Sequence, residues 1–496
     1  MLSHCASSAS QYTVPSSKGI KVTSTLSVVE SNLLPSAFLA RPIKIVAIGT
    51  GISGIQFAHD ATTSLQNIDL VIYERNPSVG GTWYENRYPG CTCDVPSHTY
   101  QFNWSPNQSW SSLYPPAPEI HQYLEDVTDQ HDLRRFMKFN TECILAEWDE
   151  ESSKWKVVLR DVVSNERKTV IADVFVYAVG RLNNYKIPEI EGQEDFAGRK
   201  VHTANWPADI DVTGKRVAVI GNGASAVQCV AALQPAASEI TNIARGPTWI
   251  LPHVFSADGA IQHQYTTEEK RDIQSCPERY YGFCLSLEKQ LAAGFPGLWK
   301  GTTSQTKFTS LALAFMKSKI KDPELLKSLL PAFEAGCRRF TPGGHYLDAL
   351  QNLVTESGDN YECDVLVYAT GFEPYKPRFP VIGRDGQSLM KDWDQEGPCE
   401  SYMASMVAGF PNMFVFHPPT SPVNGSAIPG IERASNYMIR VLSRLQTDAL
   451  RSVCLKKDAQ IAFNKWVQSR MPHMVWSGPC SSWCKWNNPP IALFGD

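Results

Sequence analysis

Apolar runs alternate with helix-like segments through the first part of the chain. Residues 43–48 form a short run of β-branched and aliphatic side chains, residues 69–73 form the next, and residues 55–64 between them have the character of a helix. A continuous apolar run bounded by turn residues predicts a strand that is buried on both faces. The order strand, helix, strand predicts an α/β fold with a parallel sheet.

A glycine-rich loop follows the first predicted strand directly. Its sequence is Gly49-Thr50-Gly51-Ile52-Ser53-Gly54. In a dinucleotide-binding loop the first glycine makes a tight turn, the second lets the backbone approach a pyrophosphate, and the third lets the helix pack on the strand. The second strand ends in Glu74, about twenty residues further on, where a carboxylate accepts hydrogen bonds from ribose hydroxyls and repels a 2′-phosphate. The site therefore predicts FAD or NAD and not NADP.

An internal repeat predicts a second domain of the same kind. The segment Asp173-Val174-Phe175-Val176-Tyr177-Ala178-Val179-Gly180 recurs as Asp364-Val365-Leu366-Val367-Tyr368-Ala369-Thr370-Gly371. Between the copies an apolar run, residues 216–220, leads into Gly221-Asn222-Gly223-Ala224-Ser225-Ala226, which has the alanine that the fingerprint permits at its third glycine position. The next predicted strand ends in Arg245 and Gly246. A cation at this place selects a 2′-phosphate, so the second nucleotide is predicted to be NADPH.

The chain is therefore predicted to hold two Rossmann-like dinucleotide-binding domains, for FAD and NADP, with a helical insertion. We expect a flexible extension over residues 1–40 and the first part of the FAD domain over 41–190, including strands near 144–148, 155–160 and 168–171. The NADPH domain is expected over 191–350, with helical spacing over about 256–335 that would cap the site. Residues 351–496 would complete both domains.

Composition narrows the class of protein. The chain has 496 residues, of which 43% are hydrophobic and 19% charged, and its 46 basic and 50 acidic residues give a net charge of −4. This balance predicts a globular enzyme and gives no sign of nucleic-acid binding. We find no apolar run long enough for a transmembrane segment and no secretory signal, so a cytoplasmic enzyme is expected. The Ser-rich, acid-poor start leaves a transit peptide open.

The 13 cysteines are odd in number and scattered. Without a secretion signal, such a set predicts reduced thiols rather than a disulfide framework. Cys91 and Cys93 with His98, and Cys480 with Cys484, lack the paired CxxC spacing of a zinc site. We therefore predict packing thiols and no metal.

A fingerprint-like pattern lies between the two glycine loops. It consists of Phe196, Gly198, His202, Trp206 and Pro207, spaced as FxGxxxHxxxWP. The pattern resembles the fingerprint of the Baeyer–Villiger monooxygenases, flavoproteins that insert one oxygen atom of O2 next to a ketone carbonyl. The resemblance implies that this segment is a hinge, in which the histidine and the tryptophan couple domain rotation to cofactor position without acting as acid or base.

Two more blocks resemble the same family, and the resemblance extends from residue 43 to the C-terminus. Residues 80–90 with Asp94 resemble the loop that closes over the flavin, which implies that Asp94 lies beside the isoalloxazine. Residues 337–343 resemble the basic pair, which implies that Arg339 lies over the flavin and Arg338 helps to hold the NADP phosphate. The family pattern further implies FAD contacts from Thr82, Trp83, Val95 and Tyr100 and an NADP contact from Thr92.

The resemblance implies an NADPH-consuming, FAD-dependent enzyme that converts a ketone and O2 into an ester or lactone, in fungal secondary metabolism. Arg339 would stabilise the developing oxyanion and Asp94 would orient Arg339. Two alternatives stay open: a nitrogen- or sulfur-oxidising flavin monooxygenase, and a non-redox isomerase or binding protein that holds FAD. The second arises because residues 351–363 are far fewer than the corresponding residues 143–172 of the first repeat. A deletion and an error in the gene model would both explain the difference.

Overall fold

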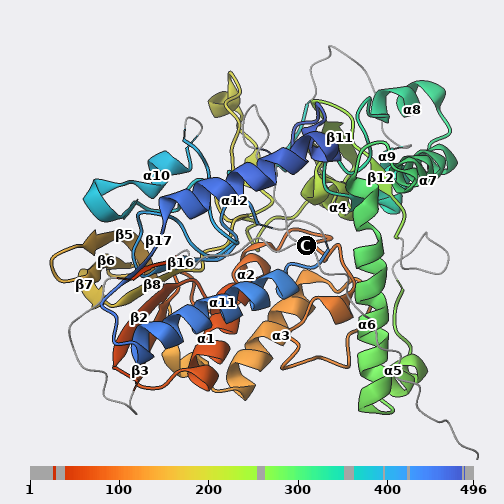
Figure 1. Ribbon diagram of the computed structural model, residues 1–496. Helices are drawn as coiled ribbons and strands as arrows, with labels where there is room; N and C mark the ends of the chain where they lie inside the picture. The colour runs from red at the N-terminus through yellow and green to blue at the C-terminus, as the bar shows by residue number, and fades with distance from the viewer. Residues whose placement is uncertain are drawn as a thin grey trace, which may run out of the picture.

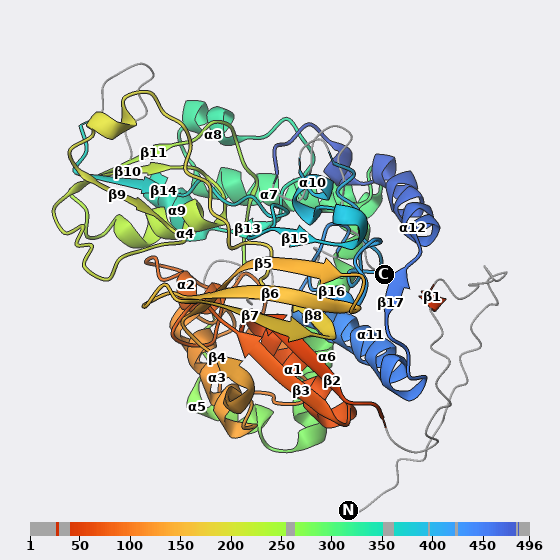
Figure 2. The same cartoon turned by 90° about the vertical axis from the view of Figure 1, so that its left-hand side faces the viewer.

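The computed structural model describes residues 40–253, 263–350, 362–394, 397–421, 425–482 and 485, together with the backbone of Leu26–Val28. Two α/β units make up the molecule (Figure 1), the first around β2, β3 and α1 and the second around β11 and α4. A further sheet, containing β5, β6 and β7, lies between them in the view of Figure 2.

The first unit is built on a parallel sheet with the strand order β16-β8-β2-β3-β4. Alternate residues of its central strand point to opposite faces: Ile45 and Ala47 belong to the core under the helices, and Val46 and Ile48 belong to the core under the next sheet. Because both faces are covered, the strand is apolar throughout. Its elements are β2 (Ile43–Ile48), β3 (Ile68–Tyr73), β4 (Met137–Lys138), β8 (Val174–Tyr177), β16 (Met413–Val415), α1 (Ile52–Ser64), α3 (Ala117–Gln130) and α11 (Ile428–Thr447).

The second unit has the parallel strand order β11-β10-β14-β9. Helices α4 and α9 pack against each other beside it. The fingerprint contributes the edge strand, since His202 pairs with Tyr368 of β14. Part of the predicted hinge is therefore regular sheet. The elements are β9 (Arg199–His202), β10 (Arg216–Ile220), β11 (Glu239–Ile243), β14 (Val365–Tyr368), α4 (Ala224–Leu233) and α9 (Gly344–Leu350).

The internal repeat has the same structural task in both units. The carboxylate at the start of each copy accepts a hydrogen bond of 2.9 Å from the backbone amide of the neighbouring strand, Asp173 from Lys44 and Asp364 from Arg216. The alanine near its end lies against the first glycine of the nucleotide loop: a Cβ on Gly49, at φ +106°, would meet the Ala178 oxygen at 2.6 Å, and one on Gly221, at φ +124°, would meet the Ala369 oxygen at 2.3 Å. The repeat thus fixes where each glycine loop turns.

The intervening sheet has the strand order β15-β5-β6-β7. Strand β15 pairs in parallel with β5, and the pairs β5–β6 and β6–β7 are antiparallel. The predicted strands of residues 143–172 are confirmed with bounds a few residues longer, as β5 (Thr141–Asp149), β6 (Lys154–Asp161) and β7 (Arg167–Ala172), joined by β15 (Val381–Ile382).

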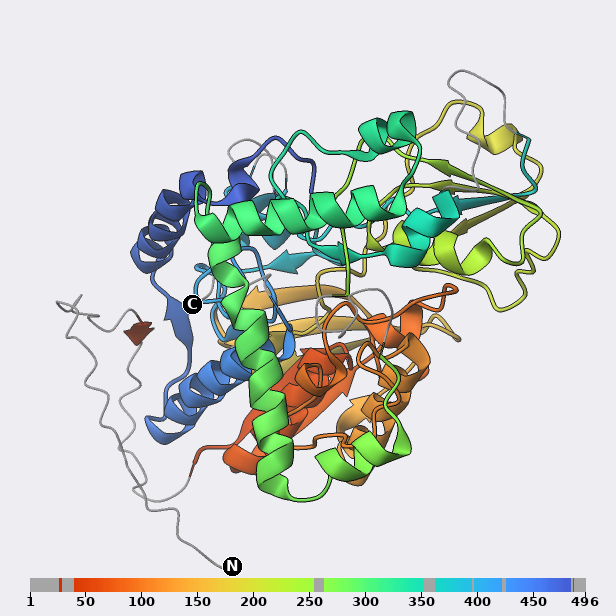
Figure 3. The same cartoon turned by 90° about the vertical axis from the view of Figure 1, so that its right-hand side faces the viewer.

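The described part of the predicted insertion, residues 263–335, is mainly helical, as its spacing predicts, and residues 256–262 lie outside the described residues. Helix α6 begins directly after Cys276 and runs down one side of the molecule from the second unit to the first (Figures 1 and 3). The side-chain amide of Gln101 donates a hydrogen bond of 2.7 Å to the hydroxyl of Tyr280 and so ties this helix to the first unit. The elements are β12 (Ile250–Leu251), α5 (Thr267–Ile273), α6 (Pro277–Ala293), α7 (Thr303–Lys319), α8 (Pro323–Leu329) and β13 (Thr341–Pro342).

A short strand in the predicted N-terminal extension, β1 (Leu26–Val28), pairs antiparallel with β17 (Val453–Leu455). Of the shortened segment that follows α9, residues 351–363, all but the last two residues lie outside the described residues. No helix in the described ranges is long and apolar enough to cross a membrane. The remaining helices are α2 (Thr82–Glu85), α10 (Leu389–Asp392) and α12 (Lys457–Arg470).

Candidate active site

A cavity of about 410 Å³ begins at the carboxyl ends of β2, β3 and β8 and extends toward the second unit. Ligands bind at such strand ends in open α/β sheets. Many residues predicted to contact FAD or NADP line it together. They are Gly49, Gly51, Ser53, Glu74, Thr82, Trp83, Thr92, Asp94, Tyr100, Ala224 and Arg339.

Glu74 stands at the end of β3 as the sequence predicts. Its carboxylate accepts hydrogen bonds of 2.9 Å from the backbone amides of Thr50 and Asn76. The side chain is buried, and this burial raises the pKa of Glu74 above its ordinary value in spite of the two amides. The carboxylate is thereby fixed at the mouth of the glycine loop, where it can accept from a ribose.

Trp83 and Tyr100 form one wall of the cavity. The indole Nε1 donates a hydrogen bond of 3.2 Å to the Tyr100 hydroxyl, and the two rings meet edge to face. Val95, in contrast, does not line the cavity in the described structure, because it is buried in the hydrophobic core of the first unit. The predicted contact of Val95 with the flavin stays a prediction, and the structure shows that its side chain packs in that core.

Asp94 and Arg339 form a two-pronged ion pair on the cavity wall. Nε and Nη2 of the guanidinium donate hydrogen bonds of 2.5 and 2.9 Å to the two carboxylate oxygens. The carboxylate raises the pKa of Arg339 above its ordinary value, so the arginine stays charged. A bidentate pair holds the guanidinium plane in one orientation. The two residues that the family pattern assigns to catalysis are thus in direct contact.

The second glycine loop meets the other arginine of the basic pair. Asn222 donates to the backbone oxygen of Gly246 and accepts a hydrogen bond of 3.3 Å from Nη1 of Arg338. Burial and the nearby Arg245 guanidinium lower the pKa of Arg338. Two nearby cations beside a nucleotide-binding loop are the kind of groups that bind an anion such as a phosphate.

The fingerprint residues have separate structural tasks. A Cβ on Gly198 would meet the Phe196 ring at 2.4 Å and the Asp364 oxygen at 2.5 Å, so glycine is needed where β9 begins. Nδ1 of His202 accepts a hydrogen bond of 3.0 Å from the Ala204 amide, and burial lowers the pKa of His202 to about 4. The imidazole is therefore neutral at physiological pH, with its proton on a buried Nε2 that has no partner among the described residues. Trp206 packs against the core of the second unit.

Sequence reasoning missed several residues of this cavity. Nη2 of Arg181 lies 3.0 Å from Nδ1 of His417, and both residues line the first unit's end of the cavity. Burial and this arginine lower the pKa of His417 to about 3. Arg181 directly follows the glycine that ends the first repeat copy, and this position is the signal that could have identified it.

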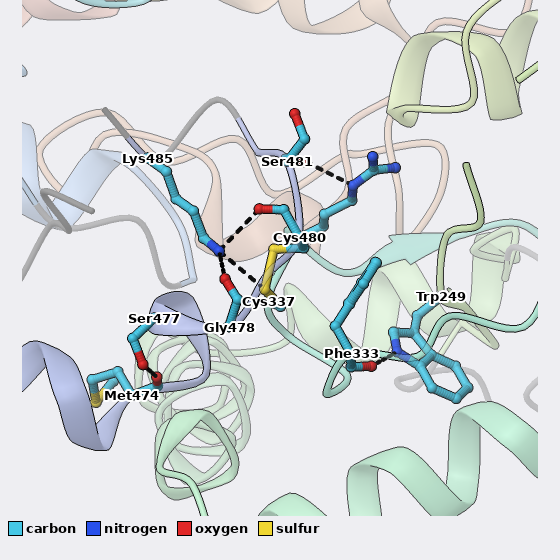
Figure 4. Close-up of a disulfide and its surroundings, with 10 residues drawn as sticks. Trp249, Phe333, Cys337, Met474, Ser477, Gly478, Cys480, Ser481 and Lys485 are labelled. Carbon is cyan, nitrogen blue, oxygen red and sulfur yellow. Dashed lines mark hydrogen bonds between the residues drawn. A yellow bond between two sulfur atoms is a disulfide. The ribbon is translucent and has the colours of Figure 1, made fainter. Parts of the chain in front are cut away.

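The cysteines differ from the prediction in one respect. Cys337 and Cys480 are joined in a disulfide (Figure 4), whereas Cys91, Cys93 and other cysteines of the described ranges are free thiols. Two cysteines that are 143 residues apart in sequence give no local signal of pairing. Within the described ranges no group of His, Cys, Asp and Glu side chains is arranged to hold a metal ion.

Comparisons with known proteins agree with this geometry. A family model described as an NAD(P)-binding Rossmann-like domain matches residues 48–115. An FAD-binding monooxygenase of Dothistroma septosporum is 35% identical over 96% of this chain and 79% of its own length. A protein of Pseudomonas aeruginosa named Baeyer–Villiger monooxygenase is 34% identical over 90% of this chain and 86% of its own. The chain belongs to the Baeyer–Villiger monooxygenase family.

Solved structures of Baeyer–Villiger monooxygenases and related enzymes share the fold. The closed crystal structure of a cyclohexanone monooxygenase has a TM-score of 0.77 and 26% identity, and the match covers 92% of this chain and 95% of that one. A steroid monooxygenase bound to NADP has the same TM-score and coverage at 24% identity. The predicted fold class and family are confirmed, and the predicted cofactors agree with the names of these relatives.

Proposed function

We propose that this Baeyer–Villiger monooxygenase uses FAD and NADPH to insert one oxygen atom of O2 next to the carbonyl of a ketone, giving an ester or lactone. The observation that carries the proposal is the Arg339–Asp94 pair, which meets on the wall of a cavity lined by the first glycine loop, Glu74 and α4. The proposal includes a role in fungal secondary metabolism, of which the similarity to an FAD-binding monooxygenase of Dothistroma septosporum supports the fungal part.

The residues present fit both cofactors. Glu74 is fixed to accept ribose hydroxyls, and a Cβ on Gly223 would meet no atom within 4 Å, which leaves the space that a pyrophosphate needs at the N-terminus of α4. Arg245 and Arg338 would hold the 2′-phosphate. When bound, FAD would supply the redox chemistry, because it can be reduced by NADPH and can then activate O2.

The side chains of the protein would stabilise the charge that develops on the ketone oxygen and would hold the guanidinium of Arg339 in place. The ketone carbonyl oxygen gains negative charge when the carbonyl carbon is attacked, and the fixed Arg339 guanidinium would stabilise that charge. Asp94 would hold the guanidinium plane through its two hydrogen bonds. His202 is buried and neutral, so it would act as a structural link and not as an acid or base.

The test uses the purified protein loaded with FAD. We expect NADPH consumption that depends on a ketone, with a product heavier than the ketone by one oxygen atom in mass spectrometry. NADPH consumption that responds to amines or sulfides and not to any ketone would overturn the proposal in favour of nitrogen or sulfur oxidation. Bound FAD without any NADPH consumption would overturn it in favour of the non-redox alternative.

A further inference from the structure

The disulfide joins two parts of the chain that are far apart in sequence. Cys337 lies just before Arg338 and Arg339 in the sequence, and Cys480 lies near the C-terminus. Both residues are buried, with 0% and 6% of their surface exposed. The bond therefore fastens a C-terminal segment, defined here as residues 475–482 and 485, to the loop that carries the basic pair.

The start of the C-terminal segment is anchored independently of the disulfide. Val475 and Trp476 pack with Leu298 and Met474 in a small hydrophobic cluster, and Phe340 of the basic loop lies against that cluster. This packing places the segment beside the basic loop. After Gly478 the segment reaches Ser481, which contacts Arg338 of the basic loop.

The end of the C-terminal segment binds Arg338. Nε of Arg338 donates a hydrogen bond of 2.8 Å to the backbone oxygen of Ser481, the residue after Cys480. Nη1 of the same guanidinium donates to Asn222 of the second glycine loop. On the other side, Lys485 donates a hydrogen bond of 3.0 Å to the Cys480 oxygen, and its Nζ lies 3.3 Å from the Cys337 sulfur.

The two hydrogen bonds of Arg338 have acceptors in different parts of the chain. Asn222 belongs to the loop between β10 and α4, whereas Ser481 directly follows Cys480, which the disulfide joins to the residue before Arg338. Arg338 also lies near Arg245, which repels it. Without the contact to Ser481, this repulsion and the flexible side chain would let the guanidinium turn away from the nucleotide loop.

We propose that the Cys337–Cys480 disulfide is a positioning device for Arg338, which keeps its guanidinium turned toward the site of the NADP 2′-phosphate. This inference rests on the proposed use of NADPH. A small dithiol would reduce the Cys337–Cys480 disulfide by thiol–disulfide exchange and so release Arg338. The S–S bond breaks, two thiols form from two electrons and two protons of the dithiol, and the dithiol closes to its own disulfide.

The first experiment compares the FAD-loaded protein before and after treatment with dithiothreitol. Mass spectrometry of peptides should find residues 337 and 480 cross-linked before treatment and separate afterwards. NADP+ affinity, measured by titration, should fall about tenfold, the effect of one lost charge-assisted hydrogen bond. FAD content should stay the same, because neither Cys337 nor Cys480 lines the cavity at the first glycine loop.

Two variants complete the test. Cys480→Ser should bind NADP+ as weakly as the reduced wild type and should not respond to dithiothreitol. Cys276→Ser, which removes an exposed free thiol before α6, should respond as the wild type does. The wild-type comparison stands even if Cys480→Ser fails to fold.

The proposal is overturned if reduction leaves NADP+ affinity unchanged, or if the oxidised protein contains no cross-link between the two cysteines. Its failure differs from a failure of the proposed function. A protein whose NADP+ affinity depends on the disulfide but which oxidises no ketone would refute the monooxygenase reaction and support the positioning of Arg338.

Discussion

Tyr88 of the first unit and Gln228 of the second are joined by a hydrogen bond of 2.7 Å from the tyrosine hydroxyl to the glutamine Oε1. The same glutamine donates from Nε2 to the backbone oxygen of Thr92 at 3.0 Å. Gln228 lies on α4, which follows the second glycine loop, and Thr92 lies two residues before Asp94. The Gln228 side chain therefore links helix α4 of the second unit to the loop that carries Asp94, the proposed catalytic carboxylate.

Replacing this glutamine should loosen the link between the two units. Gln228→Leu removes these contacts, including the one from the buried Tyr88 hydroxyl, at a net cost of about 0.5–1.5 kcal/mol for each hydrogen bond. We expect a higher KM for NADPH and less product per NADPH consumed, with FAD still bound. Gln122→Leu, on the exposed face of α3, serves as the control in steady-state kinetics. An unchanged ratio of product to NADPH in Gln228→Leu would contradict the role.

Arg339→Lys tests whether a two-pronged cation is needed. Lysine keeps the charge but cannot make both hydrogen bonds to Asp94 in one plane. Ester formation should fall by about 100- to 1000-fold, the usual effect of losing one electrostatic group in an active site. FAD absorbance of the purified variant should be retained, and Arg135→Lys at an exposed ion pair is the control. A variant that forms ester at the wild-type rate would remove Arg339 from the mechanism.

Arg245→Ala tests the choice of nicotinamide cofactor. The guanidinium lies close to Arg338 at the proposed phosphate site, and its loss removes one charge-assisted contact to a 2′-phosphate. We expect kcat/KM for NADPH to fall by about tenfold or more, with kcat/KM for NADH little changed. Lys215→Ala, an exposed cation before β10, should leave both values as they are. Equal losses with the two cofactors would show that Arg245 does not read the phosphate.

Buried histidines should make the protein less stable in mild acid. Burial lowers the pKa of His98 and of His202 to about 4, and that of His417 to about 3. An unfolded histidine has a pKa of about 6.5, so the unfolded state binds more protons between about pH 6.5 and pH 4. Stability contributed by each neutral histidine is present above pH 6.5 and is lost as the pH falls through this window, by at most about 1.4 kcal/mol per pH unit.

Removing one of these histidines should make the stability of the protein depend less on pH. His98→Gln should show a smaller fall in Tm between pH 7 and pH 5 than the wild type, whatever its Tm at pH 7. His473→Gln is the control, because this side chain is exposed in the folded protein. Parallel curves of Tm against pH for wild type and His98→Gln would show that His98 does not contribute.

Local patterns predicted the two nucleotide loops and the residues at the ends of the following strands. The chain turns at Gly49 and Gly221 because the backbone of a repeat copy lies against each glycine and leaves no room for a Cβ. The positions of Glu74 and Arg245 could be predicted from the length of the strand–helix–strand unit. A resemblance to a family added Asp94 and Arg339, whose contact could not be derived from spacing. The same pattern did not indicate that the Val95 side chain packs in the core of the first unit, because burial of a side chain depends on which way the chain turns.

The sequence by itself determined the fold class, the two nucleotide loops and the sign of the charge at each strand end, because these features depend on backbone geometry within about thirty residues. Only the tertiary structure decided which distant residues meet. Asp94 pairs with Arg339 across 245 positions, Tyr88 with Gln228 across 140, and Cys337 with Cys480 across 143. Such contacts join segments that are far apart in sequence and meet only when the whole chain has packed, so no local pattern of residues indicates them.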